Sequence, residues 1–191
     1  MEKTLILVKP DGVQRGLVGE VTSRFERAGL KIVAAKMVWI DKAFAEKHYL
    51  DREDFLLGLG EKTLKTYQEY NLDPQKDFGT KDPKELGKMI RSWLVEYITS
   101  GPVVAMTLEG IHAVDQARAL AGVTVPYYAA PGTIRRDFSI DSPDIANARR
   151  RGLKNIVHVS GNQEEAKYEV DLWFSRDEIY DYKRADEDVM F

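Results

Sequence analysis

The sequence predicts an α+β fold in which an antiparallel four-stranded sheet carries helices on one face. The first observation is a continuous apolar run at residues 4–8, the second is the β-α-β-β-α-β order of apolar runs and amphipathic stretches that follow. The third is the length of 191 residues, which suits one domain large enough to bury a core. We therefore expect residues 1–191 to form a single domain.

The first three elements follow directly from residue spacing. Residues 4–8 lack polar alternation and are closed by Lys9-Pro-Asp-Gly12, as is typical of a central strand buried on both faces. Leu17, Val21 and Phe25 then recur at helical spacing, and Gly29 is placed to end that helix. Residues 31–40, rich in Val, Ile and Trp, predict the second strand.

The second half of the chain repeats this scheme. Residues 103–108 predict a strand after Gly101-Pro102, and residues 113–121 predict a helix stopped by Gly122. The stretch around His158 completes the sheet, and the pattern Ser160-x-x-Gln163 predicts the N-terminal cap of a last helix. This order of elements is that of a ferredoxin-like sandwich.

Two segments interrupt the scheme, and a tail follows it. Residues 58–89 carry a helix start with Asp82 at the N-cap and Pro83 behind it, which predicts an inserted helical hairpin rather than a second active site. A second insertion at residues 139–151 ends in Arg149-Arg-Arg151, a cluster that is solvated or meets phosphate. Residues 175–191 look like an arm that docks through its aromatic residues Tyr180, Tyr182 and Phe191.

Composition excludes several classes of function. A net charge of -3 argues against general nucleic-acid binding, and the absence of cysteine excludes disulfides and thiolate chemistry. The apolar opening is too short for a signal sequence or a membrane span. We expect a cytoplasmic protein without membrane or nucleic-acid partners.

The stretch Asn155-Ile-Val-His158-Val-Ser160, with Glu169 beyond it, has the groups that a nucleophilic histidine needs. Taken alone, His158 is more often a hydrogen-bonded core residue. Groups suited to phosphate recur along the chain in Lys9, Arg118, Thr124 and Arg135, the last at the end of the stiff turn Pro131-Gly-Thr-Ile-Arg135. Three of these residues also have a plainer interpretation: Lys9 as a solvated lysine, Arg118 as a surface charge and Arg135 as part of a loop-bracing salt bridge.

Together these motifs resemble the nucleoside diphosphate kinase family, and the resemblance spans Thr4 to about Phe174 apart from the two insertions. It implies that His158 is phosphorylated, on Nδ1, and that Glu169 and Ser160 support it. It also implies that a set of side chains holds the phosphates and the sugar: Lys9, Tyr49, Arg118, Thr124, Arg135 and Asn155. Phe55 is the candidate for base stacking, with core filler as its alternative, and stacking alone would give broad base specificity.

The activity implied by this resemblance is transfer of the γ-phosphate of a nucleoside triphosphate, typically ATP, to a nucleoside diphosphate by a ping-pong route. It implies Mg²⁺ held through the nucleotide phosphates, without protein ligands of its own, and a homo-oligomer, either a hexamer or a tetramer. The rival interpretations are a catalytically idle nucleotide or nucleic-acid binding module and a regulatory or assembly domain.

Three positions depart from the family pattern. Arg136 and Val159 stand where glycine is common, and Gly161 stands where aspartate is usual. These departures leave the outer contacts of the metal open. We expect the two other histidines, His48 and His112, to be structural.

Overall fold

The structure, a computed structural model, describes residues 1–190, so Phe191 of the expected arm lies outside the described residues. The chain divides into two compact units. The sheet unit consists of Met1–Trp39, Pro102–Ile140 and Asn155–Phe191, and the helical unit consists of Ile40–Gly101 and Asp141–Lys154. The helical unit therefore contains the first of the segments that interrupt the predicted strand order and all of the second except residues 139–140.

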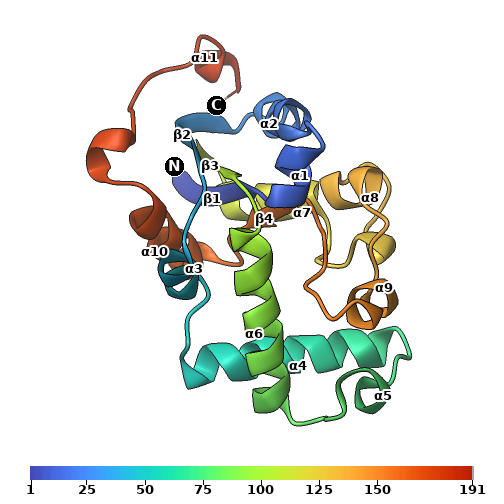
Figure 1. The fold of residues 1–191 in the computed structure, drawn as a ribbon. Coiled ribbons are helices and arrows are strands. Elements are labelled where there is room, and N and C mark those ends of the chain that lie inside the picture. The colour runs from blue at the N-terminus through green and yellow to red at the C-terminus, as the bar shows by residue number, and fades with distance from the viewer. Residues whose placement is uncertain (191) are drawn as a thin grey trace. The chain divides into compact units, whose positions relative to one another are not determined.

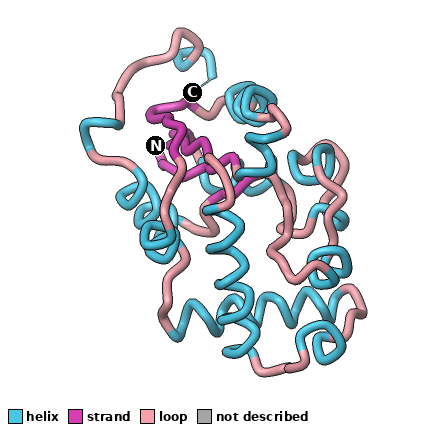
Figure 2. Tube along the Cα trace, in the orientation of Figure 1, coloured by secondary structure: helices cyan, strands magenta, loops and turns pink. Residues whose placement is uncertain are grey.

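The sheet unit is built on four antiparallel strands, as predicted (Figures 1 and 2). They are β1 (Glu2–Val8), β2 (Lys31–Val38), β3 (Val103–Gly110) and β4 (Val157–Val159). Their order is β2-β3-β1-β4, which makes β1 an inner strand between β3 and β4. The fully apolar run in β1 reflects this position, because its side chains are buried on both faces.

Two crossover helices cover one face of the sheet. Val21 and Phe25 of α2 (Val18–Arg27) and Ala117 of α7 (Ala113–Ala121) pack in one core with Ile6 and Val8 of β1. The remaining helices of this unit are shorter or follow the sheet: α1 (Pro10–Gln14), α8 (Ile134–Phe138), α10 (Gln163–Trp173) and α11 (Glu187–Met190), with 3-10 turns at Pro126–Tyr128 and Arg176–Glu178. The β-α-β-β-α-β order is thus the ferredoxin-like one.

Helix α10 lies against β1 on the other side of the sheet. Alternation along a strand turns Leu5 and Leu7 away from Ile6 and Val8, and His158 pairs with Leu7 and so faces the same way. The His158 side chain meets Glu169 of α10 there. The cap of this helix differs from the prediction, because Asn162, not Ser160, accepts a hydrogen bond from the backbone amide of Glu165.

The helical unit contains α3 (Lys42–His48), α4 (Glu53–Glu69), α5 (Pro74–Phe78), α6 (Pro83–Thr99) and α9 (Pro143–Ala148). Helices α4 and α6 form the long hairpin, and Asp82 caps α6 as predicted by accepting the amide of Glu85 at 2.8 Å. The two helices cross at glycines. A Cβ atom on Gly60 would lie 1.8 Å from the carbonyl oxygen of Pro83, and one on Gly87 would lie 1.9 Å from that of Leu56.

A partly buried ion pair joins two residues in the second segment of the helical unit. The guanidinium of Arg151 donates to both carboxylate oxygens of Asp141, at 2.6 and 2.9 Å, and Asp141 also accepts the backbone amide of Lys154 at 2.7 Å. Of the arginine cluster at residues 149–151, Arg151 is thus used within the segment, whereas Arg149 and Arg150 are exposed.

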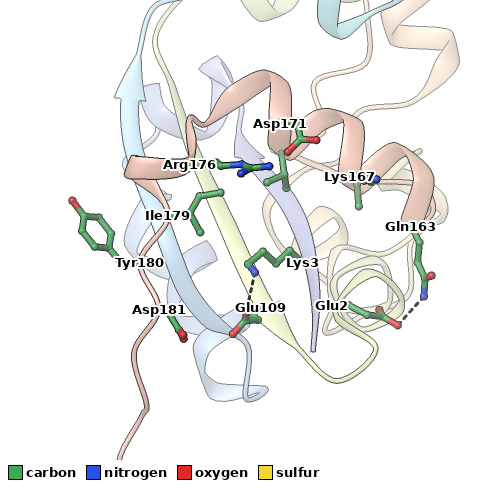
Figure 3. A pocket seen from close by; sticks show the side chains of 12 residues that line it. Glu2, Lys3, Glu109, Gln163, Lys167, Asp171, Arg176, Ile179, Tyr180 and Asp181 are labelled. Atoms are coloured by element: carbon green, nitrogen blue, oxygen red, sulfur yellow. Dashed lines mark hydrogen bonds and ion pairs between the residues drawn. The ribbon is translucent and has the colours of Figure 1, made fainter.

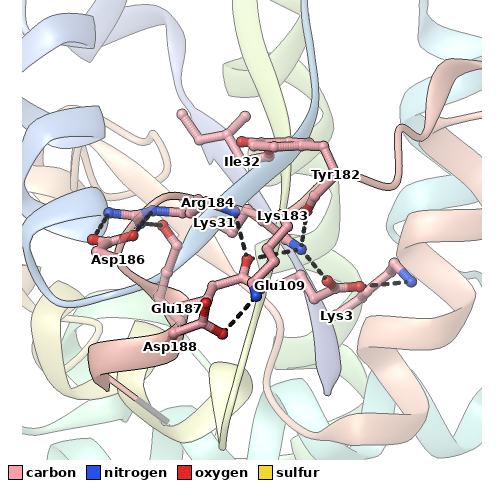
Figure 4. A network of polar contacts seen from close by, with 11 residues as sticks. Lys3, Lys31, Ile32, Glu109, Tyr182, Lys183, Arg184, Asp186, Glu187 and Asp188 are labelled. Carbon is pink, nitrogen blue, oxygen red and sulfur yellow. Dashed lines mark hydrogen bonds and ion pairs between the residues drawn. The ribbon is translucent and has the colours of Figure 1, made fainter.

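The arm that follows α10 runs along the edge strand β2 (Figure 4). The amide of Tyr180 donates to the carbonyl of Val33 at 2.8 Å. Lys31 contacts Glu109 at 3.0 Å and Glu187 at 3.3 Å, and it donates to the carbonyl of Tyr182 at 2.7 Å. Burial lowers the pKa of Lys31, but its hydrogen bonds to Glu109 and Glu187 outweigh burial and raise the pKa above its usual value.

A groove of about 640 Å³ lies between α10, the start of β1 and the arm (Figure 3). Its wall is of mixed charge, with Lys167 and Arg176 near Asp171 and an ion pair between Lys3 and Glu109. Among the described helices, none combines the length and the apolar composition that crossing a membrane requires.

Candidate active site

His158 lies in the short strand β4, and its position is set by pairing with β1. Its side chain is 18% exposed, and its Nε2 lies 2.9 Å from Oε1 of Glu169, which is 8% exposed. A carboxylate only accepts hydrogen bonds, so this contact places the proton of a neutral imidazole on Nε2. The lone pair of the ring is then on Nδ1.

Glu169 has a second partner on its other oxygen. The hydroxyl of Ser160, which is fully buried, donates to Oε2 of Glu169 at 2.6 Å and accepts the backbone amide of Leu5 at 3.2 Å. The amide of Ser160 in turn donates to the carbonyl of Leu5 at 3.3 Å. The structure therefore brings together His158, Ser160 and Glu169, and it fastens this group to β1.

A second chain of contacts begins at Lys9, which follows β1. Its ammonium group donates to Oδ1 of Asn155 at 2.8 Å, and the side-chain amide of Asn155 donates to the carbonyl of Thr124 at 2.9 Å. Lys9 is 4% exposed, as is Asn155. Three of the predicted phosphate-binding and sugar-binding residues are thus adjacent, although they are far apart in sequence.

Arg135 is held by two backbone carbonyls. It lies in α8, after the predicted stiff turn, and donates to the carbonyl of Gly122 at 2.6 Å and to that of Val157 at 2.9 Å. Its exposure is only 7%. Burial, together with the positive charge of Arg135, lowers the pKa of Lys9 to about 7, although the charge of Asp11 acts in the opposite direction. Two cations buried in one place provide the electrostatics of an anion site.

Arg118 lies in the last turn of α7, as predicted, and donates to the carbonyl of Gly161. It is exposed, as is Thr124 beyond Gly122. Gly122 has a φ of 82°, a conformation that glycine adopts without strain, so it ends the helix and lets the chain turn toward Thr124.

Tyr49 and Phe55 belong to the helical unit, whereas the other predicted site residues belong to the sheet unit. Tyr49 is 6% exposed at the end of α3, and its carbonyl accepts a hydrogen bond from Arg91 at 2.7 Å. Phe55 is half-buried in the first turn of α4.

The positions that depart from the family pattern have structural partners. Arg136 donates to the carbonyl of Tyr127 at 2.5 Å and lies 5.8 Å from the centre of its ring. Val159 pairs with Ile6 in the sheet. The amide of Gly161 donates to Glu165 at 2.9 Å, and a Cβ atom at this position would meet the same carboxylate at 2.5 Å.

The two other histidines differ in burial. His48 is buried, and its ring lies 4.6 Å from that of Tyr49. His112 is an exposed residue at the start of α7, 3.9 Å from Glu2.

Sequence analysis missed the contact between Asp11 and Ile156. The buried carboxylate of Asp11 accepts the backbone amide of Ile156 at 3.1 Å, and Ile156 has a φ of 67°. Only the Pro-Asp-Gly pattern drew attention to this segment, as a turn. Nothing in an Asn-Ile-Val sequence indicates a left-handed isoleucine, because β-branched residues avoid that conformation.

Comparison with known proteins decides the family. The family model described as nucleoside diphosphate kinase matches residues 2–56 and 83–179. The chain belongs to the nucleoside diphosphate kinase family. As a kinase of this family, it catalyses phosphate transfer between nucleotides, which confirms the activity class expected from its motifs.

Individual nucleoside diphosphate kinases are similar over nearly the whole chain. The kinase of Pyrobaculum aerophilum is 51% identical over 94% of this chain and 98% of its own length, and that of Archaeoglobus fulgidus is 43% identical over 100% and 98%. A crystal structure of an NDP kinase from Pyrobaculum aerophilum has a TM-score of 0.87 at 49% identity, covering 94% of this chain and 99% of its own.

A second solved structure represents the reaction itself. It is described as a transition state mimic of nucleoside-diphosphate kinase from Borrelia burgdorferi with bound vanadate and ADP. Its TM-score is 0.78 at 38% identity, over 97% of this chain and 94% of that chain. The ferredoxin-like fold predicted for this chain is thus shared with nucleoside diphosphate kinases of known structure.

Proposed function

We propose that this nucleoside diphosphate kinase transfers the γ-phosphate through a phosphohistidine at His158, in a ping-pong reaction. The observation that carries the proposal is the hydrogen bond between Nε2 of His158 and Glu169, because it assigns the ring lone pair to Nδ1. A neutral imidazole held in one tautomer and one orientation is prepared to act as a nucleophile.

In the first half-reaction, Nδ1 of His158 attacks the γ-phosphorus of a nucleoside triphosphate. The bond from phosphorus to the β–γ bridging oxygen breaks, and the nucleoside diphosphate leaves with that electron pair. The new N–P bond leaves positive charge on the imidazole ring, which the carboxylate of Glu169 stabilises through Nε2–H. Ser160 holds the other oxygen of Glu169 and so fixes its orientation.

In the second half-reaction, a terminal oxygen of the acceptor diphosphate attacks the same phosphorus. The N–P bond breaks and its electron pair returns to Nδ1, so His158 is regenerated as a neutral imidazole. No proton has to enter or leave the ring. Attack and departure therefore use one site for both nucleotides, as a ping-pong reaction requires.

Lys9, Arg118 and Arg135 supply positive charge for the phosphates, while Thr124 and Asn155 supply polar groups for phosphate or sugar. Phosphoryl transfer is catalysed mainly by positioning and by fixed charge, and the buried state of Lys9 and Arg135 strengthens both effects. Tyr49 completes this set, and Phe55 stacks on the base. A base held by stacking alone is recognised without reading its edges, which supports broad base specificity.

Mg²⁺ is the expected metal, and the residues of the site suit an ion that is held by the nucleotide phosphates rather than by protein ligands. The carboxylates of Glu169 and Asp11 are engaged with His158, Ser160 and Ile156, while Lys9, Arg118 and Arg135 suit phosphate rather than a cation. The ion would therefore be held through the nucleotide phosphates. Held there, it would neutralise part of the phosphate charge.

We also propose a homo-oligomer, either a hexamer or a tetramer. Met37 and Trp39, at and just beyond the end of the edge strand β2, are 61% and 66% exposed, and large apolar side chains at a strand edge favour contact between subunits. Sedimentation at several protein concentrations tests this proposal. A monomer at all concentrations would overturn it.

The decisive experiment is incubation with ATP labelled at the γ-phosphate and Mg²⁺, without any diphosphate. We expect acid-labile, alkali-stable label on the protein, release of that label as GTP when GDP is added, and no label on His158→Ala. His112→Ala is the matched control, since His112 is exposed and should label normally. Turnover that survives in His158→Ala would refute the mechanism.

The rival proposal, an idle binding module, predicts a different result in the same experiment. It predicts bound nucleotide, no label and no transfer to GDP. Its other form predicts strong, salt-sensitive binding of DNA or RNA, for which Arg149 and Arg150 offer exposed charge.

A further inference from the structure

Ile156 has an unusual backbone conformation beside the reacting groups. Its φ is 67°, in the left-handed region, and its side chain is fully buried. A β-branched residue adopts this conformation only when its surroundings enforce it. Ile156 directly follows Asn155 and precedes β4, the strand that carries His158. The contacts that hold Ile156 in this conformation therefore also set the direction in which the chain enters from Asn155 and leaves into β4.

Two backbone contacts of Ile156 come from the segment after β1. Oδ2 of Asp11 accepts the Ile156 amide at 3.1 Å, and the amide of Lys9 donates to the Ile156 carbonyl at 2.8 Å. Asp11 is 8% exposed. The approach is close, because a Cβ atom on Gly12 would lie 3.1 Å from the Ile156 carbonyl oxygen and 2.8 Å from Cγ1 of Val8.

The turn at Ile156 connects two groups of site residues. On one side, the Asn155 side chain bridges Lys9 and Thr124. On the other side, the pairing of β4 with β1 sets His158, two residues beyond Ile156. A change in φ at Ile156 would rotate these two sides relative to each other. A displacement of about 1 Å at reacting groups is enough to slow a reaction roughly a hundredfold.

We propose that Asp11 is a positioning residue for phosphoryl transfer: by accepting the amide of Ile156, its carboxylate keeps Asn155 and His158 in their productive places. This inference rests on the proposed phosphohistidine mechanism. Asp11 acts through Ile156 and is not itself required to touch the nucleotide. Its effect should therefore fall on the rate of phosphorylation more than on nucleotide affinity.

The negative charge of Asp11 offers a competing explanation, because it raises the pKa of Lys9 against the effect of burial. The two explanations differ for Asp11→Asn. An asparagine side chain retains an oxygen that can accept the Ile156 amide but carries no charge. An alanine side chain retains neither the acceptor nor the charge.

The test compares the single-turnover rate of histidine phosphorylation, at saturating ATP and Mg²⁺, in the wild type, Asp11→Asn and Asp11→Ala. We expect Asp11→Asn to keep the wild-type rate within about threefold, and Asp11→Ala to lose about tenfold to a hundredfold with little change in ATP affinity. Asp82→Ala is the control, since it removes a carboxylate-to-amide hydrogen bond in the helical unit.

Equal loss in Asp11→Asn and Asp11→Ala would overturn the inference in favour of the charge effect, and an unchanged rate in Asp11→Ala would also overturn it. If the wild type itself forms no phosphohistidine, the proposed mechanism has failed rather than the role of Asp11. The two failures are therefore distinguishable in one data set.

Ile156→Gly provides a second test that does not depend on the stability of Asp11→Ala. Glycine adopts a φ of about 67° without strain, so the turn no longer needs to be enforced. We expect Asp11→Ser, whose shorter side chain cannot replace the acceptor for the Ile156 amide, to have a smaller effect on the phosphorylation rate in the Ile156→Gly background than alone. Equal effects in both backgrounds would show that Asp11 does not act through Ile156.

Discussion

The positive charge of the buried Arg135 guanidinium acts on the buried ammonium group of Lys9 and, after burial itself, contributes to lowering its pKa to about 7. Lys9 is 4% exposed and Arg135 is 7% exposed. Arg135 is held by the carbonyls of Gly122 and Val157, and Lys9 by Asn155. Burial of the Lys9 charge, together with the positive charge of Arg135, therefore opposes folding at pH values where Lys9 is protonated.

The first prediction concerns Lys9→Met and its dependence on pH. The pKa of Lys9 in the folded protein is about 7, below its usual value of 10.5. Between these values the unfolded chain binds a proton that the folded chain does not, so the wild type gains stability as pH rises from about 7 to about 10. The lysine is charged in both states below about pH 7, where burial of its charge is most unfavourable.

Urea unfolding of both proteins across this pH range checks the prediction. The free energy of unfolding of Lys9→Met minus that of the wild type should be largest near pH 6 and should decrease toward pH 10. A difference that stays constant with pH would mean that Lys9 has an ordinary pKa in the folded protein.

The second prediction concerns Ser160→Ala. The change removes the donor to Oε2 of Glu169 and the acceptor for the Leu5 amide, both of them buried. We expect a loss of about 1–3 kcal/mol in the free energy of unfolding. The phosphorylation rate should also fall, because Glu169 is less firmly held against His158. Ser175→Ala, at an exposed serine, should leave the phosphorylation rate unchanged.

The third prediction concerns the glycines at which α4 and α6 cross. Alanine at Gly60 or Gly87 would place Cβ within 2 Å of a backbone carbonyl oxygen, which forces the helices apart. We expect each change to destabilise the protein by about 3 kcal/mol or more. Gly58→Ala is the matched control in α4, where a Cβ atom has no neighbour within 4 Å.

Denaturant unfolding of the three variants provides the comparison. Gly58→Ala should be neutral or stabilising by up to about 1 kcal/mol, because alanine is the better helix former. Similar stability of Gly58→Ala and Gly60→Ala would contradict the close crossing of the two helices.

The fourth prediction concerns the arm in acid. Glu178 of the arm accepts hydrogen bonds from the Lys36 ammonium group and from the backbone amide of Ser175. These bonds, the first of them most strongly, lower the pKa of Glu178 from the usual 4.5 to about 2. The pKa of Glu187 is also lowered, first by its bond to the amide of Arg184. A lowered pKa means that these contacts stabilise the docked arm above about pH 4.5 and that this stabilisation is lost as pH falls, in the case of Glu178 toward about 2.

Hydrogen exchange of the Tyr180 amide, which bonds to β2, reports whether the arm is docked. Its protection, corrected for the intrinsic effect of pH, should decrease over this range before the protection of the sheet does. Glu178→Gln should reduce the pH dependence. Loss of protection at Tyr180 and in the sheet together would show that the arm does not open separately.

The sequence predicts those parts of the fold that depend on local signals. The cap at Asp82 follows from three neighbouring residues, and it is confirmed. The cap predicted at Ser160 is wrong, because Asn162 offers the same chemistry two residues later and the Ser160 hydroxyl is used by Glu169. Two cap candidates this close in sequence cannot be ranked without knowing which of them has another hydrogen-bond partner in the folded protein.

The site shows the same division between local and distant contacts. Motif order identified Lys9, Asn155 and His158, and the structure places each of them in the sheet unit. The contact of Glu169 with His158 depends on α10 returning against β1, which no local pattern encodes. The conformation of Ile156 is imposed by Asp11 and Lys9, about 145 positions earlier, so the sequence around it carries no signal of it.

Lys9 and Asn155 contact each other across 146 positions of the chain. During synthesis β1 is made early and β4, which carries His158, is made late. The edge of β1 that pairs with β4 therefore stays unpaired with that strand until most of the chain has been made. Until that moment a nascent chain lacks the contact between Lys9 and Asn155 and the pairing of β1 with β4. If His158 carries the phosphoryl group as proposed, premature termination before β4 yields a fragment without phosphotransfer activity, rather than a weakened enzyme.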